Sequence, residues 1–67
     1  MTVQRQALNS SALAAASYDD EAKTLELEFT SGRSYLYSQV PPEVFDDLVA
    51  APSAGKFFND FIKDIFF

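Results

Sequence analysis

The chain has 67 residues and a net charge of −5, with seven phenylalanines, three tyrosines, and no cysteine or histidine. A chain of this length forms one small domain that buries only about 60% of the surface its unfolded form exposes, and here neither disulfides nor a zinc site can stabilise it. The acidic balance argues against a broad, nonspecific nucleic-acid binder, because phosphate contacts need clustered lysine and arginine.

Residues 1–9 are polar and unpatterned, and we expect a flexible arm before a single domain at residues 10–67. The arm has no apolar segment typical of a signal peptide. No apolar run in the chain approaches the roughly eighteen residues of a membrane span. Since the absence of cysteine fits a reducing compartment, we expect a cytoplasmic protein that does not contact a membrane.

Two strands are predicted in the first half of the domain. Thr24–Phe29 alternates apolar and polar residues, which is the pattern of a half-buried strand. Ser10–Tyr18 is alanine-rich, which fits a helix or a strand packed under bulky neighbours. The acidic segment Asp19–Lys23 indicates a turn, so a hairpin is favoured and the alanine-rich segment is predicted to be a strand.

A second hairpin is predicted at residues 30–32, which read Thr-Ser-Gly. A three-residue loop with glycine in the third, left-handed position is a common connection. It would place Leu27 opposite Tyr35 and Leu25 opposite Tyr37. Both tyrosines would then lie on the apolar face of the sheet.

The alternative is a two-residue turn at residues 31–32, which would place the tyrosines opposite Glu28 and Glu26. A shift of one residue turns every side chain of the strand to the other face. We prefer the longer loop because it gives one coherent apolar face and leaves Leu36 pointing outward.

Two helices should follow the sheet. Proline suits the first helical position, so Pro42 begins the first helix, and Pro52 ends it because the residue before a proline is pushed out of the helical region. Its apolar stripe comprises Val44, Phe45, Leu48 and Val49.

The last helix has the strongest periodicity in the chain, and Ser53 is its expected N-cap. The apolar stripe, predicted to be core, comprises Phe57, Phe58, Phe61, Ile62 and Ile65. The predicted fold is therefore α+β: a three-stranded antiparallel β-sheet followed by two helices packed on one face.

Catalysis is not expected, since the usual general base and thiol nucleophile are absent. The acidic runs Asp19–Glu21 and Asp46–Asp47 lie in a turn and on a short helix, where carboxylates rarely converge in a cleft. The turn also lacks the ligand pattern of a calcium loop. We therefore expect no enzyme, no metal site and no cofactor.

Three binding surfaces are candidates. Ser53, Gly55 and Lys56, at a helix start, could hold an anion, although a serine cap and a glycine that lets the helix pass near the sheet explain the same residues. Tyr35 and Tyr37 are core if they face inward, and could stack on unpaired bases if exposed. Leu36 and the adjacent Phe66 and Phe67, which cannot both face one core, are candidates for contact with a partner chain.

An ordered set of residues resembles the KTSC domain, a family named for an extension at the C-terminus of some lysyl-tRNA synthetases and also found as short proteins of bacteria and phages. Its hallmark is Tyr-x-Tyr, followed by Val-Pro and by Ser-x-Gly before the final helix. The resemblance extends from Ser10 to Phe66 and rests on Ser11, Tyr18-Asp19, Leu25, Leu27, Phe29, Gly32, Tyr35, Tyr37, Val40-Pro41, Ser53, Gly55, Phe57-Phe58-Asn59, Ile62 and Lys63.

The resemblance implies a possible role with RNA, which has been suggested for the family from its place on a tRNA-charging enzyme. On this chain the corresponding candidates for nucleic-acid binding are Arg33, Tyr35, Tyr37, Lys56 and Lys63. The excess of acidic over basic residues departs from what an RNA-binding protein needs. We expect a non-enzymatic module that binds an unknown protein or its own copies, with an RNA-binding accessory domain as the alternative.

Overall fold

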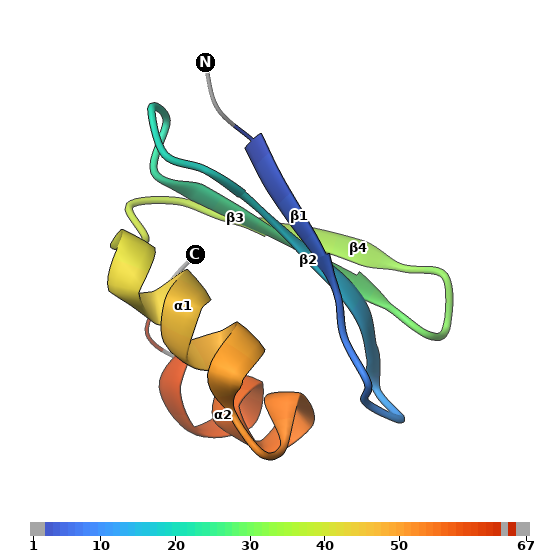
Figure 1. The fold of residues 1–67 in the computed structure, drawn as a ribbon. Helices are drawn as coiled ribbons and strands as arrows, with labels where there is room; N and C mark the ends of the chain where they lie inside the picture. The colour runs from blue at the N-terminus through green and yellow to red at the C-terminus, as the bar shows by residue number, and fades with distance from the viewer. Residues whose placement is uncertain (1–2, 64, 66–67) are drawn as a thin grey trace.

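The computed structural model describes residues 3–63 and 65. Four strands, β1 (Val3–Ala7), β2 (Leu13–Asp19), β3 (Thr24–Phe29) and β4 (Ser34–Tyr37), precede the helices α1 (Pro42–Ala50) and α2 (Ala54–Phe61). Neighbouring strands pair antiparallel in chain order, with β2 and β3 in the centre of the sheet (Figure 1). The predicted α+β class, with an antiparallel sheet followed by two helices, is confirmed.

The predicted number of strands was wrong, because the sheet has four strands rather than three. The additional strand is β1, inside the segment predicted to be an arm, and it pairs with β2 from Val3 opposite Asp19 to Ala7 opposite Ala15. All five residues of β1 are exposed. An edge strand that is exposed on both faces has no apolar alternation, so the pattern that revealed β3 is missing here.

The alanine-rich segment is strand β2, as the hairpin argument predicted. Ala15 and Ala16 are buried, and Ala16 lies opposite Leu27 of β3. On the side of Ala15, the Arg5 guanidinium of β1 reaches across β2 to the Glu28 carboxylate, with 3.0 Å between Nη2 and Oε2. Small side chains on the central strand therefore leave room for longer groups from both neighbours.

The hairpin between β3 and β4 has the predicted three-residue loop. Phe29 N–H donates to the Arg33 carbonyl at 2.8 Å, and Gly32 has a φ of +95°. Leu27 lies opposite Tyr35, and Leu25 lies opposite Tyr37. The preferred register is confirmed, because glycine supplies the left-handed position that this loop requires.

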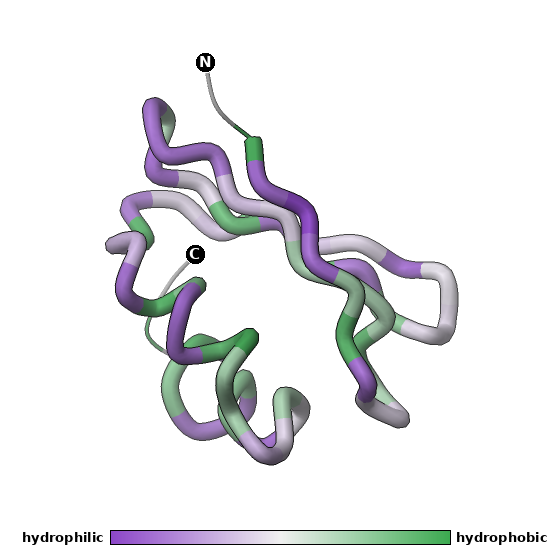
Figure 2. The backbone as a smooth tube through the Cα atoms, viewed as in Figure 1, coloured by the Kyte–Doolittle hydropathy of each residue, from purple (hydrophilic) through white to green (hydrophobic). Residues whose placement is uncertain are grey.

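The core lies between the sheet and the helices. Phe45 of α1 stacks on Tyr18 of β2 with 5.6 Å between ring centroids, and Phe58 of α2 meets Phe29 of β3 edge-on at 5.4 Å. Figure 2 shows hydrophobic segments of α1 and α2 turned towards the sheet. The buried hydrophobic cluster comprises Leu13, Ala16, Tyr18, Leu25, Leu27, Val40, Phe45, Leu48, Ala54 and Ile62.

The connection from the sheet to α1 is held by two hydrogen bonds at Val40. Its N–H donates to the Lys23 carbonyl at 2.8 Å, and its carbonyl accepts from the buried Tyr18 hydroxyl at 2.6 Å. Both polar backbone groups of a buried residue are therefore satisfied by the β2–β3 hairpin. The chain then enters α1 at Pro42, which needs no N–H partner there.

Tyr18→Phe tests this hydrogen bond, because it keeps the stacked ring and removes only the donor to the Val40 carbonyl. We expect the free energy of unfolding at neutral pH to fall by about 1–3 kcal/mol, the usual cost of a buried acceptor without its partner. Tyr35→Phe, at a half-exposed ring, is the matched control and should change it by less than about 0.5 kcal/mol. Urea unfolding measures both, and equal losses would contradict the assigned role.

Tyr18→Phe should also change how the stability of the protein depends on pH. Burial, and then the nearby carboxylates of Asp20, Glu43, Asp19 and Asp46, raise the pKa of Tyr18 above its ordinary value of 10.0. The folded state thus favours the neutral phenol, so this stabilisation is complete below pH 10.0 and is lost as the pH rises through the raised pKa. Stability of the wild-type protein should fall above pH 10.0 more steeply than that of Tyr18→Phe.

Candidate functional site

The tyrosine hairpin forms one aromatic cluster with α2. The Tyr35 ring meets Phe29 edge-on at 5.4 Å, and Phe58 contacts both Phe29, at 5.4 Å, and Tyr37, at 6.1 Å. Tyr37 is half-buried, and burial together with Tyr35 raises its pKa. Tyr35 is 46% exposed because it lies on the edge strand. The tyrosines are therefore the rim of the core, with one ring edge reaching solvent.

The three basic candidates for nucleic-acid binding lie on different elements. Arg33 is exposed on the loop that leads into β4. Lys56 lies in the first turn of α2, and Lys63 follows the end of that helix. Of the three, Arg33 directly precedes β4, the strand that carries the half-exposed Tyr35. Lys56 instead lines a hollow beside Asp60, so an acidic side chain shares its surroundings.

The start of α2 explains the serine at this position but not the glycine. Ser53 Oγ accepts from the Lys56 N–H at 3.3 Å, so the predicted N-cap is confirmed. A Cβ placed on Gly55 would lie 3.5 Å from Ser10 Oγ and 3.8 Å from the Ala12 Cβ, which are ordinary contact distances. The serine oxygen thus has a structural role. Anion binding by these residues stays a prediction.

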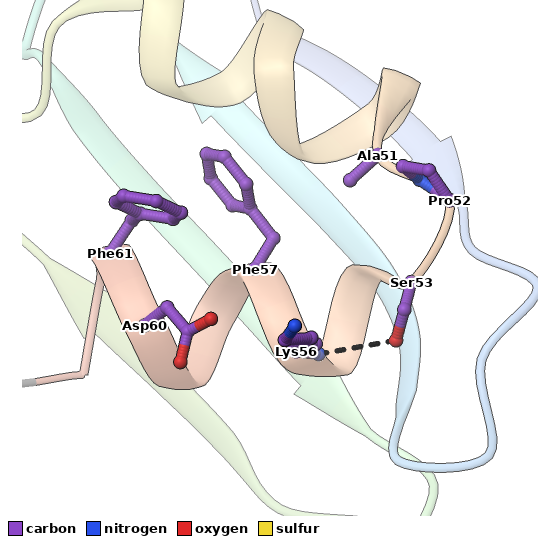
Figure 3. Close-up of a pocket in the computed structure, with 7 residues that line it drawn as sticks. All are labelled: Ala51, Pro52, Ser53, Lys56, Phe57, Asp60 and Phe61. Carbon is purple, nitrogen blue, oxygen red and sulfur yellow. Dashed lines mark hydrogen bonds between the residues drawn. The ribbon is translucent and has the colours of Figure 1, made fainter.

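An apolar hollow of about 330 Å³ lies beside α2, where α1 ends (Figure 3). Phe57 and Phe61 rise from the side of α2 that faces α1, with 5.0 Å between their ring centroids. Phe61 is 55% exposed. We call this feature the Phe61 groove; it is lined by Ala51, Pro52, Ser53, Lys56, Phe57, Asp60 and Phe61.

The prediction that the whole apolar stripe of the last helix is core was wrong for Phe61 and for Ile65, since Ile65 is 57% exposed. Positions i and i+4 share a helix face, so Phe58 and Ile62 form one stripe while Phe57 and Phe61 form another, about 100° further round the helix. Phe58 packs on the sheet and Ile62 is fully buried. The sequence shows that both stripes are apolar, but it does not show how much of them the sheet covers.

The open face of the sheet carries exposed apolar side chains as well. Leu36 lies opposite Glu26 and is 61% exposed, so its predicted outward orientation is confirmed. Leu36, Val3, Glu26 and other side chains of this face surround a hollow of about 100 Å³. The other two candidates for a partner contact, Phe66 and Phe67, lie outside the described residues.

In the acidic run Asp19–Glu21, Asp19 has a structural role in the turn. Asp19 Oδ1 accepts from the N–H groups of Glu21 and Ala22, at 3.0 and 3.3 Å, and so stabilises the β2–β3 turn.

Among residues 3–63 and 65, no group of three acidic, histidine or cysteine side chains is placed to hold a metal ion. In the same part of the chain, no helix has the length and apolarity needed to cross a membrane.

These features define a small α+β domain with a four-stranded sheet, two helices and an aromatic cluster between them. The family model of the KTSC domain matches residues 9–66. The chain therefore belongs to the KTSC domain family, and the resemblance predicted from the sequence is confirmed. The Tyr-x-Tyr of that resemblance is the pair that closes the core on β4.

Short proteins and solved structures match nearly the full length. A protein of Tsukamurella paurometabola is 54% identical over 61 residues and covers 91% of both chains. The crystal structure of a KTSC domain protein from Yersinia pestis superposes with a TM-score of 0.92 at 33% identity, covering 98% of this chain and 93% of that one.

A related sequence also occurs inside a larger enzyme. A lysine–tRNA ligase of Nostoc punctiforme is 52% identical over 50 residues, which are 75% of this chain and 9% of the ligase. The shared segment is thus a small part of that enzyme. The matches indicate no catalytic family for the chain itself.

Alanine substitution at the two glycines separates their roles. Gly55→Ala should raise the free energy of unfolding by up to about 1 kcal/mol, because alanine favours the helix and meets only ordinary contacts. Gly32→Ala should lower it by about 1 kcal/mol or more, because its φ of +95° disfavours any Cβ although the space is open. Thermal or urea unfolding measures both, and a loss of stability in Gly55→Ala would show that α2 needs glycine at this position.

Proposed function

We propose that this KTSC domain is a non-enzymatic interaction module that associates with its own copies through the Phe61 groove. The observation that carries the proposal is the exposure of Phe61 in a groove that already has an aromatic wall. Burying such a side chain contributes about 1.5–3 kcal/mol. A domain of 67 residues has a small core of its own, so an interface of this kind adds a large fraction of its stability.

The proposal takes both helices to cover one face of the sheet, so that the Phe61 groove lies on the outer side of that layer. Support comes from the ring contacts of Phe45 with Tyr18 and of Phe58 with Phe29 and Tyr37. These contacts support packing of the inner sides of α1 and α2 against the sheet. Phe61 is then available to a second molecule.

The charges of the groove fit a second copy of the chain. Lys56 and Asp60 both line it and have opposite signs. In a two-fold symmetric dimer, the same patch meets itself, so Lys56 of one copy can approach Asp60 of the other. The groove thus avoids the repulsion that two chains of net charge −5 would experience at a random contact.

The test is the molecular mass in solution. Sedimentation or light scattering from about 1 µM to about 1 mM, the range of weak association, should show a rise from 7.4 kDa towards twice that mass. Phe61→Glu should remain monomeric over the same range. Leu36→Glu makes the same change of charge on the open sheet face and should still associate. A wild-type monomer at every concentration, or equal effects of the two variants, would refute the proposal.

RNA binding is the alternative function, and the half-exposed Tyr35 beside Arg33 favours it. An exposed aromatic edge with a nearby cation can stack on an unpaired base and contact a phosphate. The lysine–tRNA ligase relatives provide a setting in which such a contact would be useful. The net charge of −5 acts against it, so the contact would have to be local.

Titration with bulk tRNA and with a short single-stranded RNA, at about 50 and about 200 mM salt, tests this alternative. RNA binding would be saturable, weaker at the higher salt concentration and lost in Arg33→Glu. Lys23→Glu makes the same change of charge as Arg33→Glu, but at the other end of β3. This control variant should leave the affinity for RNA nearly unchanged. If millimolar protein binds neither RNA, this alternative is excluded for the chain.

A further inference from the structure

A second apolar groove lies at the end of the sheet where the β2–β3 turn meets the connection into α1. Its volume is about 430 Å³, and its apolar lining comes from one residue of the turn and three residues of the connection. Both segments meet at the same end of the molecule in Figure 1. We call it the Val40 groove; it is lined by Ala22, Lys23, Gln39, Val40, Pro41 and Pro42.

The walls of the Val40 groove have a defined shape. Lys23 and Gln39, one on each wall, have φ values of +58° and +57°, in the left-handed region that residues other than glycine seldom adopt. The Val40 N–H bond to the Lys23 carbonyl joins the two walls at 2.8 Å. Tyr18 holds the Val40 carbonyl from the sheet side. The groove is therefore pre-formed, which lowers the entropic cost of binding.

The negative charge of the protein is concentrated in the turn and in the beginning of α1, which contain or adjoin the two segments that line this groove. Residues 19–23 and 42–47, the turn and the beginning of α1, contain six acidic residues and one basic residue, Lys23. Their net charge of five negative units equals that of the whole chain, since the other four acidic and four basic residues balance. Figure 2 draws most of the turn in the purple of hydrophilic residues.

Carboxylates flank both segments that line the groove: Asp20 lies two residues before Ala22, and Glu43 directly follows Pro42. Burial, and then the nearby carboxylates of Asp20 and Glu43, also raise the pKa of Tyr18, whose hydroxyl donates to the Val40 carbonyl. Lys23 is the one basic side chain on the lining, and the carboxylates outnumber it. An apolar floor inside an acidic rim selects a ligand with an apolar side chain next to a cation.

We propose that the Val40 groove docks a basic segment of another protein. An aliphatic or aromatic side chain of that segment lies against Ala22, Pro41 and Pro42, the apolar lining residues that are not fully buried, and a neighbouring arginine or lysine lies at Asp20 and Glu43. A second copy of the chain does not fit this role, because it carries the same net charge of −5. Nucleic acid is excluded from this end by the same repulsion. The inference is independent of the Phe61 groove.

The probe is a fluorescein-labelled hexapeptide of alternating arginine and leucine, with glutamate in place of arginine as the control peptide. Fluorescence anisotropy against the full chain should show saturable binding of the basic peptide, weaker at higher salt, and no binding of the acidic one. In the ¹⁵N-labelled protein, the amide signals that move should be those of Ala22, Lys23, Gln39 and Val40. Shifts confined to the Phe61 groove would overturn the proposal.

Two double variants separate a local site from general charge attraction. Asp20→Asn/Glu43→Gln should weaken peptide binding about five- to tenfold, the sum expected for two partly exposed ion pairs. Glu26→Gln/Glu28→Gln removes the same charge from β3, outside both grooves, and should change affinity by less than about twofold. Equal weakening by the two variants, or absence of saturable binding to the wild-type protein, would refute the proposal.

Discussion

The hydrogen bond from the Tyr18 hydroxyl to the Val40 carbonyl joins the sheet to the connection that leads into the helices. Tyr18 lies on a central strand, its ring stacks on Phe45 of α1, and its hydroxyl reaches the residue at which the chain leaves the sheet for the helices. The Val40 N–H is bonded to the β2–β3 turn at the same time. The buried Tyr18 side chain thereby holds the segment from which the chain enters α1. The same two hydrogen bonds hold the walls of the Val40 groove together.

The apolar surface of α2 is divided between two stripes. Phe58 and Ile62 pack in the core, whereas the neighbouring ring of Phe61 remains exposed. Charge is divided just as unevenly: the Phe61 groove has one lysine and one aspartate, whereas residues 19–23 and 42–47 hold the acidic excess. Two surfaces of different chemistry on one small domain suit a module that occurs both as a short protein and as a segment of a tRNA ligase.

Much of the candidate site was predictable as a list of residues but not as an arrangement. The pairing of Tyr35 and Tyr37 with β3 could be predicted from a three-residue loop with glycine in its last position. The N-cap role of Ser53 could be predicted from its position directly before the last helix. The exposure of Phe61 could not be predicted, because periodicity identifies a helix face without showing how much of it the sheet will cover. The Val40 groove brings together residues 22–23 and 39–42, whose contact depends on the pairing of three strands.

The sequence by itself determined the elements whose signal is local: the alternation of β3, the glycine loop, the proline that begins α1 and the serine that caps α2. It also determined the family, through residues spread over most of the chain. Only the tertiary structure decided that residues 3–7 form an edge strand, since β1 has no buried face and is held by backbone pairing with β2. Only the tertiary structure also decided which aromatic rings are core and which are surface, because burial depends on what packs against a side chain and not on its spacing along the chain.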